Sequence, residues 1–226
     1  MVRPTVRECE GATVSAKVHL EPTIGPSHRR TLCVAPMRLF IAVELDPAVV
    51  RRVAACGDEL RGRAAARAPR ARVTWVPPEH LHVTVRFIGE VEDAQGQAIV
   101  AAVERDLGVK PFDVIVQGVG TFPERGAPRV IWVGIADGGE SLAAIEREIV
   151  TRLGACGIPG EERPYHPHVT LARVREAAGL RPGPLLEGCA DRRFGTSRVD
   201  AITLFQSRPS AQGQVYVPLR RRRLTG

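Results

Sequence analysis

Features that define several protein classes are missing from this sequence of 226 residues. No apolar run approaches the roughly 18 to 20 residues that a membrane-spanning helix needs, and the N-terminus lacks the apolar region of a secretory signal. The five cysteines are scattered, and none has the C-x-x-C spacing of a redox or zinc site. These absences argue against a membrane protein, a disulfide framework and a zinc knuckle. They predict a cytoplasmic protein with reduced thiols.

Lysine is scarce too, since only Lys17 and Lys110 occur, and yet the chain is basic. Its 32 basic residues outnumber 25 acidic residues and give a formal net charge of +7. A cationic chain favours anionic partners such as RNA or nucleotides. Arginine beside abundant alanine, glycine and proline is also typical of a GC-rich coding sequence. No Walker-type phosphate loop is present, so ATP is not expected to drive a reaction.

One pattern, P-x-H-x-H-V-T, occurs twice in the chain. It spans residues 78–84 and returns 86 residues later at residues 164–170. The chain has six histidines, and four of them lie inside these two copies. Such a concentration predicts a paired site, with the rest of the chain serving as the frame that brings the copies together.

Side-chain alternation assigns two faces to the strand that follows the first copy. Residues at i and i+2 share a face of a strand. The residues predicted to face the core are Val83, Val85 and Phe87, and those predicted to face the site are His82, Thr84 and Arg86. The second copy repeats the arrangement with His168 and Thr170. One face is therefore apolar and the other carries the chemistry.

Two imidazoles on facing strands suit general acid–base catalysis. Histidine titrates near neutral pH, so one ring can be neutral and act as the base while the other is protonated and acts as the acid. A threonine hydroxyl on the same face can donate to an anionic oxygen held between the histidines. Two such strands related by an approximate two-fold axis would surround a tetrahedral anion, and phosphate is the obvious candidate.

The remaining sequence is interpreted as strands and helices around the repeat. Residues 1–36 are predicted to be a disordered extension, and Met37 is a candidate translation start that opens a domain over residues 37–226. Helices are expected after Asp46-Pro47 and on the apolar stripes near Ile99 and Leu142. Further strands are expected at 37–45, 73–76, 112–117, 129–135, 197–206 and 214–222. The predicted fold is α+β, with antiparallel sheets flanked by helices in two pseudo-symmetric lobes and a central cleft.

The doubled H-x-T motif resembles that of the 2H phosphoesterases, and its surroundings resemble the RNA 2′,3′-cyclic phosphodiesterase branch, also called 2′-5′ RNA ligases. The resemblance covers roughly Met37 to the C-terminus. The segments that carry it are Met37–Ala42, His82–Thr84 with Phe87 and Gly89, Pro128–Trp132, Pro167–Arg173, and the closing Leu204, Ser207, Gly213 and Tyr216.

This resemblance implies a bilobal fold whose cleft holds both histidines. It also implies opening of a 2′,3′-cyclic phosphate, on an RNA end or a nucleoside, to a 2′-phosphomonoester without metal or cofactor. We assign His168 as the base that activates water and His82 as the acid that protonates the departing 3′ oxygen, although the approximate symmetry does not decide between them. The reverse reaction with an RNA 5′-hydroxyl gives 2′-5′ ligation. A monomer is expected.

Four residues are predicted to contact the substrate: Thr84, Thr170, Arg173 and Arg129. The threonines could instead serve only as strand formers. Strict alternation puts Arg173 on the face opposite His168 unless the strand bulges before it, and a rim ion pair is an equal alternative for Arg129. The arginine-rich stretches 61–72 and 220–223 are interpreted as solvated surface. The alternatives are a dedicated RNA-binding patch for 61–72 and guidance of RNA for 220–223.

Two rival functions use the same residues. His80 and His166 form H-x-H pairs with the inner histidines, and four converging imidazoles could bind zinc or another transition metal. The chain could also be a non-catalytic RNA or nucleotide-binding module. Activity in EDTA tests the first rival, and turnover of a nucleoside 2′,3′-cyclic phosphate tests the second.

Overall fold

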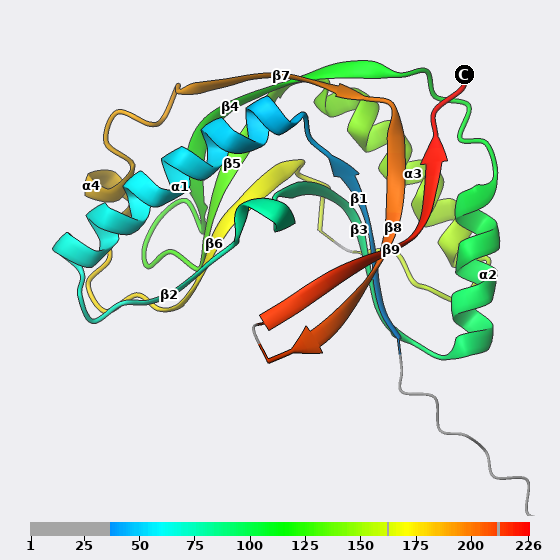
Figure 1. Cartoon of the computed structure of the whole chain (residues 1–226), viewed down its shortest axis with the longest axis horizontal. Helices are drawn as coiled ribbons and strands as arrows, with labels where there is room; N and C mark the ends of the chain where they lie inside the picture. The colour runs from blue at the N-terminus through cyan, green and yellow to red at the C-terminus, as the bar shows by residue number, and fades with distance from the viewer. Residues whose placement is uncertain (1–36, 162, 212) are drawn as a thin grey trace, which may run out of the picture. The chain divides into compact units, whose positions relative to one another are not determined.

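The computed structural model describes residues 37–161, 163–211 and 213–226, so the predicted disordered extension lies outside the described residues. Nine strands form one sheet in the order β7-β4-β5-β6-β3-β1-β8-β9, and β2 pairs with β6 beside this path (Figure 1). The strands are β1 Met37–Glu44, β2 Arg72–Trp75, β3 His82–Val91, β4 Phe112–Phe122, β5 Val130–Asp137, β6 His168–Glu176, β7 Arg193–Val199, β8 Ala201–Ser210 and β9 Gly213–Arg223. The helices are α1 Pro47–Arg67, α2 Asp93–Glu104, α3 Gly139–Gly154 and α4 Pro182–Leu186.

The sheet divides into two lobes at the junction of β3 and β6. The first lobe contains β3, β1, β8 and β9, and the second contains β6, β5, β4 and β7. The unit β1–α1–β3 in the first lobe corresponds to β5–α3–β6 in the second. All the pairings are antiparallel. The predicted α+β fold with two pseudo-symmetric lobes is therefore confirmed.

Four valines cross the centre of the sheet in register. Val43 pairs with Val83, Val83 with Val169, and Val169 with Val133. All four side chains are buried, so they fix which face of each central strand points into the core. The approximate two-fold axis passes between Val83 and Val169.

The helices tie the two lobes together. α1 begins at a proline, and the Asp46 carboxylate accepts a hydrogen bond of 2.7 Å from the backbone N–H of Ala48, as the Asp-Pro signal predicts. Although α1 follows β1 of the first lobe, its apolar face, including Val49, Val53 and Leu60, packs on the second-lobe strands β6 and β7. Conversely, α3 follows β5 of the second lobe and packs on β3 of the first as well as on β5. Among the described residues, no helix is both long and apolar enough to cross a membrane.

The prediction of one continuous strand over residues 197–206 is wrong. The structure has two strands there, β7 and β8, which are separated by Asp200. β7 pairs with β4 in the second lobe and β8 with β1 in the first. The carbonyl of Asp200 accepts a hydrogen bond of 2.8 Å from the N–H of Leu224 as the chain passes between lobes. Both strands are apolar on their core faces, so the break leaves no mark in the hydrophobic pattern.

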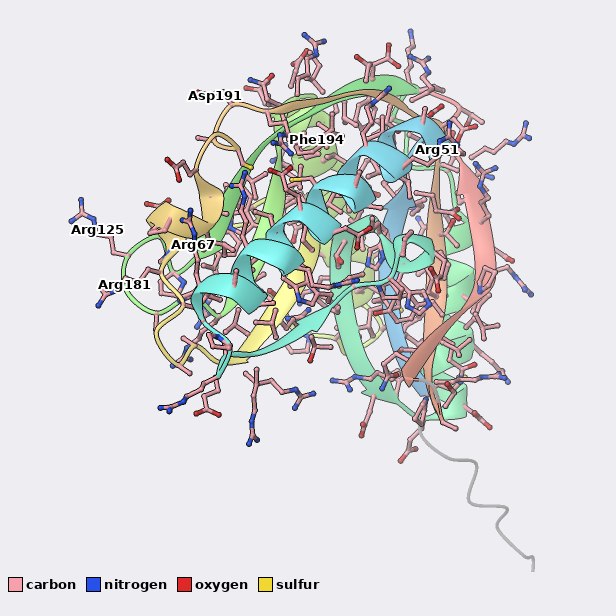
Figure 2. The ribbon with its side chains drawn as sticks, turned by 60° about the vertical axis from the view of Figure 1, so that its left-hand side comes forward. Arg51, Arg67, Arg125, Arg181, Asp191 and Phe194 are labelled. Carbon is pink, nitrogen blue, oxygen red and sulfur yellow. The ribbon has the colours of Figure 1, made fainter. Side chains whose placement is uncertain are left out.

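The arginine-rich stretches are largely ion-paired surface, as interpreted. The pairs in the first stretch are Arg61–Asp58, Arg63–Glu59, Arg67–Glu187 and Arg72–Glu176. Figure 2 shows Arg67, the last residue of α1, close to α4. Its guanidinium donates a hydrogen bond to the backbone carbonyl of Pro184 in α4. In the second stretch, Arg220, Arg221 and Arg222 of β9 pair with acidic groups. These arginines are engaged within the protein.

Candidate active site

The register of β3 against β6 brings the two H-x-T motifs together. Val83 pairs with Val169 in antiparallel fashion, so His82 stands opposite Thr170 and Thr84 stands opposite His168. Because the two valines face the core, the histidines and threonines project from the other face. All four of these side chains are half-buried. Each histidine therefore lies beside the threonine of the other motif across the approximate two-fold axis.

Each inner histidine is oriented by the backbone carbonyl two residues before it. Nδ1 of His82 lies 2.7 Å from the carbonyl oxygen of His80, and Nδ1 of His168 lies 2.7 Å from that of His166. A carbonyl oxygen can only accept, so Nδ1 carries the proton in both rings. In the neutral state Nε2 is then the free base. At His82, this nitrogen lies 3.1 Å from the Thr84 hydroxyl, which donates to it.

Burial shifts both histidines toward their neutral forms. It lowers the pKa of His82 to about 4, and the positive field of Arg173 acts in the same direction. Burial also lowers the pKa of His168. The hydrogen bond to the backbone carbonyl of His166 opposes this shift, and the charges of the His166 ring and of Arg173 act in the same direction as burial. At neutral pH the empty site therefore holds two neutral imidazoles. A bound anion would favour the protonated form of either one.

The outer histidines pack on aromatic rings instead of converging on a shared centre. The ring of His80 lies 4.3 Å, centroid to centroid, from that of Tyr216 in the first lobe. The ring of His166 lies 5.5 Å from Phe122 and 5.5 Å from Trp132 in the second lobe. The described residues contain no group of three or more His, Cys, Asp or Glu side chains placed to hold a metal ion. The arrangement therefore gives no geometric support to the four-imidazole metal site.

A bulge in β3 overturns the predicted alternation beyond Thr84. Ala42 of β1 pairs with Thr84 and Ile41 pairs with Arg86, which leaves Val85 as an extra residue. The strand face shifts at this point. Arg86 is therefore buried, with an ion pair of 3.1 Å to Glu161, and Phe87 is 54% exposed instead of lying in the core. The predictions for Arg86 and Phe87 were wrong for this reason.

The same irregularity recurs in β6 and decides the place of Arg173. Ile131 of β5 pairs with Ala172 and Trp132 pairs with Thr170, so Leu171 is the extra residue. Arg173 consequently turns to the face of His168 and Thr170, and it is exposed. It is the pseudo-symmetric counterpart of Phe87. The site thus carries an apolar ring at this position in one lobe and a guanidinium in the other.

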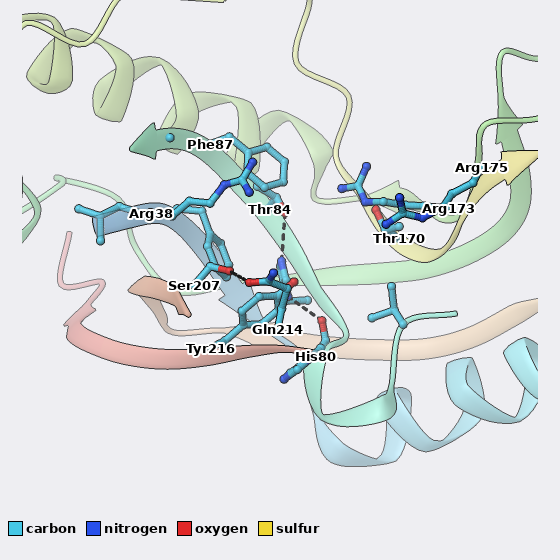
Figure 3. A pocket seen from close by; sticks show the side chains of 15 residues that line it. Arg38, His80, Thr84, Phe87, Thr170, Arg173, Arg175, Ser207, Gln214 and Tyr216 are labelled. Carbon is cyan, nitrogen blue, oxygen red and sulfur yellow. Dashed lines mark hydrogen bonds between the residues drawn. The ribbon is translucent and has the colours of Figure 1, made fainter. Parts of the chain in front are cut away.

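Two neighbouring cavities, which share Thr84 and Phe87, cover the H-x-T face. The first cavity, of about 630 Å³, contains His82, Thr170 and Arg173, and Figure 3 shows it with Arg38 on one side and Arg173 and Arg175 on the other. The second cavity, of about 730 Å³, contains His168 and Arg129. The residues of the expected single cleft are therefore divided, with Arg173 in the first cavity and Arg129 in the second.

Three cavity residues were not singled out as contacts from the sequence: Arg38, Arg175 and Tyr216. Arg175 follows Arg173 by two residues on β6, so alternation from Arg173 would have found it once the bulge was known. Arg38 and Tyr216 lie in the opening and closing segments that carry the family resemblance. Tyr216 packs edge-on against His82, with 5.7 Å between ring centroids.

Comparison with known proteins points to one family. The family model of the 2′-5′ RNA ligase superfamily matches residues 48–209, which include both H-x-T motifs. The RNA 2′,3′-cyclic phosphodiesterase of Archaeoglobus fulgidus is 31% identical over 187 residues, which make up 81% of this chain and 98% of that protein. The protein of the same name from Aeropyrum pernix is 36% identical over 146 residues, or 64% of this chain and 82% of that protein.

Solved structures share the fold. The protein TT0787 of Thermus thermophilus superposes with a TM-score of 0.67 at 28% identity, covering 83% of this chain and 98% of that one. E. coli LigT, in a complex with 3′-AMP, gives a TM-score of 0.65 at 24% identity, covering 85% of this chain and all of that one. The fold, the doubled motif and the family match agree, and the chain belongs to the 2′-5′ RNA ligase superfamily.

Proposed function

We propose that this chain hydrolyses RNA 2′,3′-cyclic phosphate ends to 2′-phosphomonoesters by general acid–base catalysis with two histidines. The observation that carries the proposal is the antiparallel pairing of Val83 with Val169, which sets each histidine opposite the other motif's threonine. Relatives that match most of the chain are named RNA 2′,3′-cyclic phosphodiesterases. RNA ends and nucleoside 2′,3′-cyclic phosphates are the proposed substrates.

In the proposed mechanism, the cyclic phosphate lies between the two motifs. The hydroxyls of Thr84 and Thr170 donate to its non-bridging oxygens, and Arg173 balances the negative charge that grows in the transition state. Nε2 of His168 takes a proton from water as the water oxygen bonds to phosphorus. The bond from phosphorus to the 3′ oxygen breaks, and that oxygen takes a proton from Nε2 of His82. In the related ligation an RNA 5′-hydroxyl attacks phosphorus in place of water, the bond from phosphorus to the 3′ oxygen breaks, and a 2′-5′ linkage forms.

Hydrolysis of adenosine 2′,3′-cyclic phosphate by the purified protein tests the proposal. The expected product is the 2′-phosphate, identified by phosphorus NMR against authentic 2′- and 3′-AMP. Turnover that persists in EDTA would exclude the metal-dependent rival. Binding of the cyclic nucleotide without turnover would favour the non-catalytic rival, and formation of the 3′-phosphate would contradict the proposed leaving group.

The proposed setting is a monomer in the cytoplasm. The proposal rests on the free thiols of Cys56, Cys156 and Cys189, since reduced cysteines are typical of that compartment. Size-exclusion chromatography with light scattering tests the monomer, and a disulfide-linked or dimeric native protein would contradict this setting.

The threonines provide a milder prediction than the histidines. Thr84→Val and Thr170→Val keep the shape and strand preference of the side chain but remove the hydroxyl. Hydrogen bonds to charged groups contribute about 1.5–3 kcal/mol, so each variant should lower kcat/KM by about 10-fold to 100-fold. Steady-state kinetics with the cyclic nucleotide measures the loss. Thr121→Val, at a buried threonine outside both cavities, is the control, and equal losses in all three variants would contradict the role of the two motif hydroxyls.

The lowered histidine pKa values predict an acidic optimum for the free enzyme. Catalysis needs one protonated and one neutral imidazole, and burial lowers the pKa of His82 to about 4 and also lowers that of His168. Raising the pH above both values removes the required proton. The maximum of kcat/KM should therefore lie below about pH 6.5, the ordinary histidine pKa. A bound phosphate anion raises both pKa values, so the alkaline limb of kcat should lie at higher pH than that of kcat/KM. A kcat/KM that rises to a plateau above neutral pH would contradict this.

A further inference from the structure

The two cavities differ sharply in charge. The first cavity has three arginines in its wall, Arg38, Arg173 and Arg175, and the described residues that line it include no carboxylate. The second cavity also contains arginines, but Glu146 and Glu161 stand beside them. Burial raises the pKa of Glu146, and Glu161 raises it further. A polyanion is therefore accommodated better in the first cavity than in the second.

Within the described part of the chain, no ion pair or hydrogen bond holds the guanidinium groups of the first cavity. Arg38 stands opposite Glu90 of β3 and Ser207 of β8 in the sheet, yet its guanidinium makes no ion pair or hydrogen bond with any described residue. The same is true of Arg173 and Arg175 within the described part of the chain. Glu176, the acidic neighbour of Arg175 in the sequence, pairs with Arg72 of β2 instead, at 3.4 Å.

This contrasts with the arginines on β9. Arg220 pairs with Glu104 at 2.7 Å, Arg221 with Asp200 at 2.9 Å, and Arg222 with Asp106 at 3.4 Å. Those three side chains are therefore held by ion pairs within the protein. The arginines of the first cavity have no ion-pair partner among residues 37–161, 163–211 and 213–226, so they can bind an external anion. Such contacts are charge-assisted when the partner is a phosphate.

Arg38 and Arg175 lie away from the phosphate position between the threonines. At about 3.3 Å per residue, Arg175 is roughly 16 Å along β6 from Thr170. By the same rise, Arg38 is roughly 13 Å along β1 from Ala42, the residue that pairs with Thr84. Figure 3 shows the two guanidiniums on opposite sides of the cavity. A cyclic phosphate bound at the threonines therefore leaves both of them for other groups of the substrate.

We propose that the first cavity is the subsite for the sugar–phosphate backbone upstream of the cyclic end, with Arg38 and Arg175 binding backbone phosphates. The RNA strand leaves the site on the His82 side, past Tyr216, and not through the second cavity. This inference rests on the proposed function and adds a strand direction and a preference for oligonucleotides over mononucleotides.

The experiment compares kcat/KM for a short oligonucleotide ending in a 2′,3′-cyclic phosphate with kcat/KM for the corresponding nucleoside 2′,3′-cyclic phosphate. The variants are Arg38→Ala and Arg175→Ala. The matched control is Arg163→Ala, which removes the same charge from the second cavity. The ratio of oligonucleotide to mononucleotide should fall about tenfold in each of the two test variants and stay at the wild-type value in the control. Arg38→Lys and Arg175→Lys should recover most of the ratio.

Salt dependence supplies a second readout. Each phosphate contact to a single strand contributes about 0.7 to the magnitude of the slope of log affinity against log salt concentration. For the oligonucleotide, this slope should therefore be smaller by about that amount in each alanine variant. The proposed path of the RNA strand is overturned if the ratio of kcat/KM for oligonucleotide to mononucleotide falls in Arg163→Ala instead. It is also overturned if this ratio is unchanged in every variant. If the wild type turned over neither substrate, the proposed function would fail. The subsite would then be tested separately by fluorescence anisotropy, as salt-dependent binding of an oligonucleotide ending in a 2′-phosphate.

Discussion

His82→Ala and His168→Ala should each lower kcat for 2′,3′-cyclic phosphate hydrolysis by about 10²-fold to 10⁴-fold, the range that a positioned general acid or base contributes. The expectation follows from the geometry of Nε2. Nδ1 of each ring is held 2.7 Å from a backbone carbonyl, so only Nε2 is available to exchange a proton with the substrate or water. Alanine removes this nitrogen and leaves the carbonyl in place.

Single-turnover kinetics with nucleoside 2′,3′-cyclic phosphate measures this loss directly, because it reports the chemical step apart from product release. His80→Ala is the matched control, since His80 orients the catalytic ring through its backbone carbonyl and its imidazole packs on Tyr216. It should lose less than about tenfold, well below the range for a catalytic acid or base. Wild-type activity in either inner-histidine variant would refute the mechanism.

The double variant His82→Ala/His168→Ala should be only slightly slower than the slower single variant. Groups that act in one concerted step are strongly non-additive, because the loss of either partner already abolishes the shared transition state. Independent, multiplicative losses would indicate that the two histidines act in separate steps.

The sequence alone is sufficient to predict the chemical face of the site. The spacing in H-x-T places histidine and threonine on one strand face, and a β-branched valine between them favours the core. The duplication predicts the pseudo-symmetry that the valine register of the sheet displays. The Asp46-Pro47 signal likewise predicts the start of α1, because the cap is a local interaction between neighbouring residues.

Positions beyond the bulges could not be predicted in the same way. Alternation holds only while the two strands advance together, and the extra residues Val85 and Leu171 are defined by the partner strands β1 and β5. Both are ordinary apolar residues with no turn signal beside them. As a result, Phe87 was assigned to the core although it is exposed in the site, and the orientation of Arg173 depended on a bulge that only the structure reveals.

The packing of the helices across the two lobes could not be predicted from the sequence either. The apolar stripe of α1 predicts a buried face but not which strands cover it, and the structure places it on β6 and β7 of the other lobe. The cleft is divided into two cavities, and Thr84 and Phe87 line both of them. Such long-range contacts are set by the whole sheet, so local patterns contain no signal for them.

The two histidine roles are separable by changing the leaving group. In a nucleoside whose 3′ oxygen is replaced by sulfur, the cyclic 2′-O,3′-S phosphorothiolate releases a thiolate. A thiol has a pKa near 8.5, far below that of an alcohol, so its departure needs little help from an acid. His82→Ala should then recover about 10²-fold or more of its lost activity on the sulfur substrate, because the missing acid is no longer required.

His168→Ala should show no such recovery if His168 is the base, because attack by water still requires removal of a proton. The measurement is the ratio of kcat/KM for the sulfur and oxygen substrates in wild type and both variants. Recovery in His168→Ala alone would reverse the two roles while preserving the paired mechanism, and recovery in neither would show that leaving-group protonation is not the function of either ring.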